Sequence, residues 1–296
     1  MTRSRPTPAD RVFTSRGVTA IMVMVGLIVM ASSGVAPAAV VMSLLPAAAL
    51  AVLNKVYNLT HSTSMLYVGL YMLMQAVMPA EIQTVAGLTF ASVTLVATGI
   101  MFLCFHAPHH RRTIFMVFFT LGIGSLFSSA YWTLILVFIL GVYNMRAFTL
   151  RGVVAALLGL LTPPLLLMGY GVMAPRLPMP DFRPVTPEAV IAAPDVFVSG
   201  LALTGCCVLA GSVCVLLTYG FQAESRNYNA SIHILTLYAI VMFFLDFGHS
   251  HCYMPLLAVC AAYQTALFST SRARGYIGGT VALIVCLALL IFNIWR

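Results

Sequence analysis

Charged residues are scarce in this chain. Asp, Glu, Lys and Arg make up only 7% of its 296 residues, whereas about 25% is usual in a soluble domain. Hydrophobic residues make up 61%, so a fold in water could not cover its surface with polar groups. The shortage of charge excludes an ordinary soluble domain and predicts that the lipid bilayer surrounds most of the protein.

The chain also lacks the short motifs of common catalytic and metal sites. Its seven cysteines are odd in number, lie mostly in apolar runs and include no CxxC pair, which argues against a disulfide framework or a zinc ribbon. No GxxxxGKS, GxSxG or HExxH sequence is present, so the usual phosphate-binding, nucleophile and zinc motifs are missing. We therefore predict no catalytic residue, no metal site and no cofactor.

Apolar segments predict the fold class, an all-α integral membrane protein with about eleven transmembrane helices. A helix needs about 20 apolar residues to cross the hydrocarbon, and several segments are shorter. The short pairs either span the membrane or form re-entrant hairpins. The segments are residues 17–33, 36–53, 64–78, 84–105, 113–128, 130–145, 152–173, 196–219, 231–247, 252–269 and 276–294.

A single membrane domain accounts for nearly the whole chain. Residues 1–16 form a basic segment that we expect in the cytoplasm, and residues 17–296 form one polytopic domain with a proline-rich outer loop at 174–195. We expect the loop to be a connector with a helical turn at 187–193. The N-terminus also resembles a signal peptide, but apolar character continues to Leu53, which favours an uncleaved first helix.

The basic residues predict the orientation. With the N-terminus in the cytoplasm, twelve of the 15 Lys and Arg residues fall on the cytoplasmic side, as the positive-inside rule requires. Only Arg176, Arg183 and Arg296 fall on the opposite side. The net charge of +8 therefore reflects membrane orientation and does not indicate nucleic-acid binding. Membrane lipids are the expected partners, together with a lipid-linked or small-molecule substrate.

The most chemically varied stretch is LDFGHSHCYM, residues 245–254. Asp246 and His249 share a face if this region is α-helical, as we expect through Gly248, and His251 follows in the turn. These side chains suit zinc binding or proton transfer, but polar residues also gather where a helix leaves the membrane. We favour this last interpretation. It predicts a hydrogen bond between Asp246 and His249 at the headgroup level and no tight structural metal site.

Arg146 and Arg151 follow the sixth predicted helix on the cytoplasmic side. Their planar guanidinium groups suit phosphate binding, although anchoring to anionic headgroups is the commoner role. The sequence thus offers five weak candidates for binding a substrate. They are Asp246, His249, His251, Arg146 and Arg151.

Three segments of the chain have loosely defined motifs but follow one another in a recognisable order. They are residues 53–79, 129–170 and 266–295. They include an arginine-led helix with the sequence GLLTP and a last helix that ends in NIW. In these features the chain resembles an uncharacterised family of polytopic bacterial inner-membrane proteins of about this length. The resemblance implies a bacterial cytoplasmic-membrane location and no established activity. The stretch LDFGHSHCYM is not a feature of that family.

Three functions are compatible with these observations. We favour a non-enzymatic protein of envelope biogenesis, either a transporter or an assembly subunit, because eleven predicted helices and one stiff outer loop fit such a protein. The lack of paired charges in the apolar segments argues against an ion-driven pump. The alternative is a lipid-linked glycosyl or phosphoryl transferase at the outer face. Such an enzyme needs carboxylates as bases or metal ligands, and the outer-face acidic residues form no pair. A metal-handling protein, based on His249 and His251, ranks third.

Overall fold

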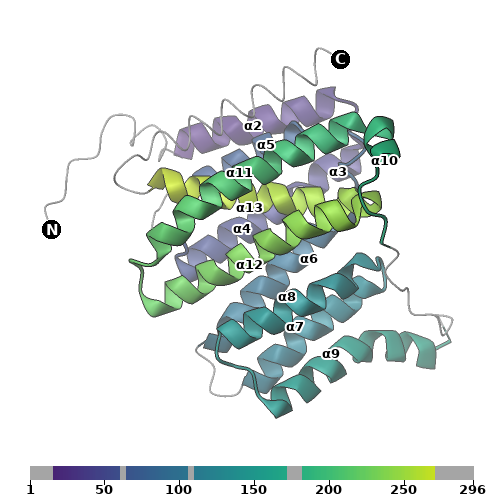
Figure 1. The fold of residues 1–296 in the computed structure, drawn as a ribbon, viewed down its shortest axis with the longest axis vertical. Coiled ribbons are helices and arrows are strands. Elements are labelled where there is room, and N and C mark those ends of the chain that lie inside the picture. The colour runs from purple at the N-terminus through teal and green to yellow at the C-terminus, as the bar shows by residue number, and fades with distance from the viewer. Residues whose placement is uncertain (1–15, 61–64, 106–109, 172–181, 271–296) are drawn as a thin grey trace, which may run out of the picture.

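The structure, a computed structural model, describes residues 16–60, 65–105, 110–171 and 182–270. Every regular element in these ranges is a helix, and the helices form one bundle (Figure 1). The predicted segment 276–294 lies outside the described residues. The elements are α2 (Arg16–Ser32), α3 (Pro37–Met42), α4 (Leu44–Tyr57), α5 (Leu66–Ala76), α6 (Val85–Phe102), η1 (Leu103–Phe105), α7 (His110–Ser125), α8 (Ala130–Asn144), α9 (Leu150–Gly169), α10 (Pro187–Ala192), α11 (Pro194–Thr218), α12 (Ala223–Leu245), η2 (Phe247–His249) and α13 (Ser250–Thr270).

Six helical stretches of the described chain are long and apolar enough to cross a membrane, by length and composition. The helices α2, α5 and α8 are also apolar but have only 10–17 residues. The all-α class is therefore confirmed, with six candidate spans. These are Pro37–Tyr57, Val85–Phe105, Leu150–Gly169, Pro194–Thr218, Ala223–Leu245 and Phe247–Ser269.

The helix boundaries differ most from prediction at α12, which begins at Ala223 and not at residue 231. Its first turns are polar, with the sequence AESRNYNA, and Glu224 lies in the first turn, where a negative charge favours the helix. Apolar runs mark the part of a helix that suits hydrocarbon, so they miss a polar extension. The helical turn expected near residue 187 is confirmed as α10.

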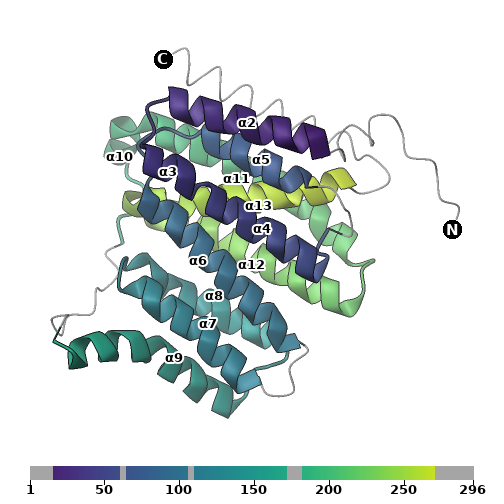
Figure 2. The ribbon, with the colours of Figure 1, turned by 180° about the vertical axis from the view of Figure 1, so that it is seen from behind.

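The helix α13 lies in the centre of the bundle, against α5, α6, α11 and α12 (Figures 1 and 2). Within its candidate span, 89% of the residues are buried. A helix that is apolar on every side is stable only when it is surrounded by other helices or by lipid. In the first turn of α13, Cys252 and Tyr253 are buried, whereas the candidate histidine His251 is only partly buried.

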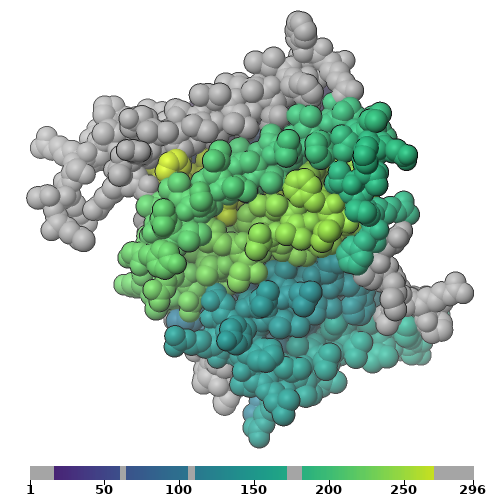
Figure 3. Space-filling model, in the orientation of Figure 1, coloured from purple at the N-terminus to yellow at the C-terminus, as the bar shows by residue number. Residues whose placement is uncertain are grey.

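The helix α9 lies at the edge of the bundle and packs mainly on α7. The two backbones approach closely, because a Cβ at Gly159 would run into the carbonyl oxygen of Phe115 and one at Gly122 would lie 2.6 Å from that of Leu160. Small residues permit this kind of contact between membrane helices. In the space-filling view, α7, α8 and α9 form the teal part of the molecule below the green α11 and α12 (Figure 3).

Candidate functional site

The first candidate site is the junction between α12 and α13, residues 246–250. Asp246 follows the end of α12 with φ −138° and ψ 59°, and the 3-10 turn η2 precedes α13. We expected an α-helix through Gly248, and this is wrong. A Cβ at Gly248 would lie 2.9 Å from side-chain atoms of Arg183. Packing against a segment more than sixty residues away therefore constrains the turn.

The Asp246 carboxylate is 3% exposed and has a partner on each oxygen. His249 Nδ1 donates to Oδ1 at 2.9 Å, and the Tyr253 hydroxyl donates to Oδ2 at 3.0 Å. The backbone N–H of Arg183 also donates to Oδ1, at 3.3 Å. The predicted hydrogen bond between Asp246 and His249 is confirmed. The carboxylate itself is buried, however, because α13 and the segment around Arg183 cover it.

Residues 183–185, which we call the strap, run across the junction. The Val185 N–H donates to the carbonyl oxygen of Phe244 at 3.1 Å, and the Gly248 N–H donates to that of Arg183 at 3.3 Å. Together with the bond to Asp246, these contacts attach the end of the proline-rich loop to the bundle. The sequence offered no signal for this attachment, because backbone hydrogen bonds depend little on residue type.

Two further hydroxyl groups extend the site toward α8. The Tyr238 hydroxyl on α12 is hydrogen-bonded to Thr133 on α8, and the Tyr238 ring packs edge-on against that of Tyr253, with the ring centroids 6.2 Å apart. Asp246 is therefore hydrogen-bonded to the partly exposed His249 and to Tyr253, and the hydrogen-bonded pair Tyr238 and Thr133 packs beside Tyr253. We call these five residues the Asp246 cluster. A carboxylate paired with an imidazole in this way is competent to accept and pass on a proton.

His251 does not join the cluster. Its ring centroid lies 6.0 Å from that of His249, and the carbonyl of His251 packs against Gly87 of α6. Cys252 is fully buried. Among the residues that the structure describes, no group of three or more His, Cys, Asp and Glu side chains is placed to hold a metal ion. The sequence did not point to Tyr238 or Tyr253, because tyrosines within apolar helices carry no signal of their own.

The second candidate site lies at the other end of α8. Arg146 there has a φ of 57°, the left-handed conformation that costs a residue with a side chain about 1 kcal/mol or more. Its N–H donates to the carbonyl oxygen of Tyr143 at 2.9 Å, and that of Ala147 donates to Val142 at 3.1 Å. These two bonds form a Schellman motif, in which the left-handed position is usually glycine. An arginine at this position is therefore unusual.

Residues on both sides of Arg146 in the sequence fix its position, Asn144 by contacts to α12 and Thr149 by capping α9. The amide of Asn144 donates to the carbonyl oxygen of Asn227 at 2.9 Å and to Ser231 Oγ at 3.2 Å, which ties the end of α8 to α12. Arg151 lies in the first turn of α9 and is exposed. Thr149 caps that helix by accepting the Gly152 N–H at 3.1 Å. Both arginines thus lie near helix ends on exposed surface.

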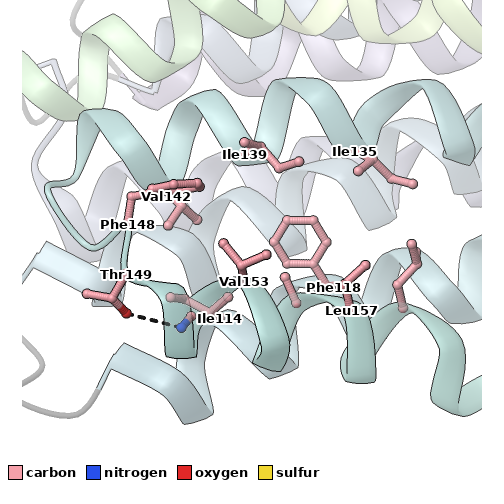
Figure 4. Close-up of a pocket in the computed structure, with 12 residues that line it drawn as sticks. Ile114, Phe118, Ile135, Ile139, Val142, Phe148, Thr149, Val153 and Leu157 are labelled. Atoms are coloured by element: carbon pink, nitrogen blue, oxygen red, sulfur yellow. Dashed lines mark hydrogen bonds between the residues drawn. The ribbon is translucent and has the colours of Figure 1, made fainter.

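Two adjoining hollows lie beside these arginines. The apolar groove, between α7, α8 and α9, has a volume of about 120 Å³; its walls include Ile114, Phe118, Ile139 and Val153 (Figure 4). The polar groove has a volume of about 550 Å³ and is lined by Leu140, Tyr143, Asn144, Arg146, Phe148 and Ile234. Phe148 lines both, so the arginine-lined hollow lies next to the apolar one.

The two candidate sites are separate. Thr133 and Arg146 lie near opposite ends of α8, about 20 Å apart along a helix that rises 1.5 Å per residue. The structure therefore brings Asp246 and His249 together, and it places Arg146 at an arginine-lined groove elsewhere. No protein-family model, curated protein or solved structure matches this chain.

Proposed function

We propose that the protein is a multi-pass protein of the bacterial inner membrane that handles an amphiphilic molecule in envelope biogenesis, as a transporter or as an assembly subunit. The apolar groove carries this proposal. A solid helix bundle would suit a purely structural subunit, whereas an apolar groove next to an arginine-lined hollow suits a molecule with an apolar chain and a polar head.

The orientation proposed with this function has eleven spans, a cytoplasmic N-terminus and an outer C-terminus. Its support is the twelve-to-three division of the basic residues and the six candidate spans among the described residues. In this orientation the Asp246 junction faces the outer side, and Arg146 faces the cytoplasm. The resemblance to an uncharacterised inner-membrane family supports the location.

The geometry of α9 favours a groove that admits a guest. The helix α9 packs mainly on α7, and side chains of both α8 and α9 line the groove between them. The groove volume of about 120 Å³ is close to that of one engineered apolar cavity, about 150 Å³, which stays dry and binds benzene, so the groove can hold a segment of an apolar chain. An apolar chain entering between α8 and α9 would lose no hydrogen bonds to water.

The groove is tested by filling it. Ala156 lines the apolar groove, whereas Val154 on the same helix is 52% exposed and does not line it. Native mass spectrometry of the full chain, released from mild detergent, should show a retained lipid-sized molecule on the wild type and on Val154→Trp. Ala156→Trp should lose it. Equal retention by both tryptophan variants would contradict the proposal.

One observation favours the alternative, a lipid-linked glycosyl or phosphoryl transferase acting at the outer face. The hydrogen-bonded pair of Asp246 and His249 is suited to act as a general base. Membrane vesicles given a radiolabelled lipid-linked sugar or phosphate donor would test it. Transfer that is lost in His249→Ala, but kept in His251→Ala, would support the enzyme. Transfer that is the same in both variants and in protein-free vesicles would exclude it.

A further inference from the structure

Arg146 occupies a position where its side chain has no role in ending α8. The helix stop is made by the main chain, through the N–H groups of residues 146 and 147, and glycine would make it without steric strain. Residues in strained backbone conformations gather at functional sites. The strain at Arg146 is thus an observation independent of the groove, and it directs attention to the guanidinium group.

Arg146 is the one charged residue among the described residues that line the polar groove. In the part of the chain that the structure describes, no acidic side chain lines the apolar or the polar groove. Arg151 lies five residues further on, in the first turn of α9, and the N-terminus of a long helix adds a partial positive charge. The polar end of the hollow therefore presents positive charge, with hydroxyl and amide groups from Tyr143 and Asn144 beside it.

We infer that the hollow between α8 and α9 binds one phosphate-headed lipid, with its chain in the apolar groove and its phosphate on Arg146. The planar guanidinium donates two parallel hydrogen bonds to phosphate oxygens. A lipid, and not free phosphate, is the occupant because the arginine is exposed to water, where a single exposed ion pair binds weakly. The apolar chain of the lipid supplies the remaining attraction by packing against Phe148, which lines both hollows. This inference rests on the proposed function and names its substrate class.

The variant Arg146→Gly separates a binding role from a structural one. Glycine fits the left-handed position better than arginine, so this variant should unfold at the wild-type temperature or above. Its affinity for the lipid should nevertheless fall at least tenfold. Arg146→Gln should lose affinity likewise, and Arg226→Gln is its matched control, since Arg226 is exposed in the first turn of α12 and lines neither groove.

The measurement is binding of fluorescent phosphatidic acid to the full chain in micelles of a neutral detergent, with diacylglycerol of the same chains and inorganic phosphate as competitors. Phosphatidic acid should bind, and neither competitor should displace it at equal concentration. Wild-type affinity in Arg146→Gly, an equal loss in Arg226→Gln, or a lower unfolding temperature of Arg146→Gly would overturn the inference. Displacement by inorganic phosphate alone would do so too, because it would assign the site to the free ion.

Failure of this inference can be told apart from failure of the proposed function. If Ala156→Trp abolishes lipid retention while Arg146→Gly leaves affinity unchanged, the groove holds an apolar chain and the phosphate assignment is wrong. If neither change alters lipid retention, the assignment of the groove to an apolar chain and that of Arg146 to the phosphate are both wrong.

Discussion

Replacing Asp246 with alanine removes the acceptor for three donors at once. The hydroxyl of Tyr253, a residue that is fully buried, would lose its partner, at a cost of about 1–3 kcal/mol for an unsatisfied buried group. The His249 side chain is 27% exposed and can turn to water. Losing its hydrogen bond to Asp246 should therefore add less than about 1 kcal/mol to the cost. With the weaker bond from the strap, the expected loss of stability is about 2–4 kcal/mol.

The assay is thermal unfolding of the full chain in detergent, followed by circular dichroism. A change of 1 kcal/mol shifts the midpoint by about 2–4 °C in chains of 150–250 residues, so Asp246→Ala should unfold about 5 °C lower or more. Asp246→Asn should lose less, because the amide offers one acceptor and donates to Tyr253, whose hydroxyl can turn to accept. Glu188→Ala is the control, since Glu188 is exposed. If Asp246→Ala unfolded at the same temperature as Glu188→Ala, the buried cluster would contribute nothing to stability and the reasoning would be refuted.

Three other outcomes are expected. Gly159→Val should push α9 away from α7 because a Cβ there meets the α7 backbone; hydrogen exchange in α9 should rise severalfold, and unchanged exchange would contradict the packing. Reporter fusions after residues 112 and 184 should report opposite sides of the membrane, and a common side would refute the eleven-span orientation. Arg151→Glu should accumulate less in membranes than Arg183→Glu, since a cation beside the anionic leaflet is worth about 1 kcal/mol; equal levels would argue against the assigned sides.

The candidate sites show how much of a site can be predicted from the pattern of residues in the sequence. Three-residue spacing was enough to predict the bond between Asp246 and His249, because that contact is local. Spacing could not reveal Tyr238, Tyr253 or the strap, since these come from other turns and from a loop whose attachment is made by backbone groups. For Arg146, the sequence indicated affinity for phosphate in general, but its left-handed φ and its place beside a groove depend on how α8 ends.

The amino-acid sequence by itself determined that the chain is helical and apolar, because hydrocarbon tolerates backbone polar groups only when they are paired within a helix. It also determined where most helices lie and which loops carry basic charge. Only the tertiary structure decided which helix occupies the centre, since α13 is no more apolar than its neighbours. It likewise decided that Asp246 is buried and that α8 and α9 leave a hollow between them. Burial and hollows arise from how surfaces fit together, and a one-dimensional pattern of apolar residues does not contain that fit.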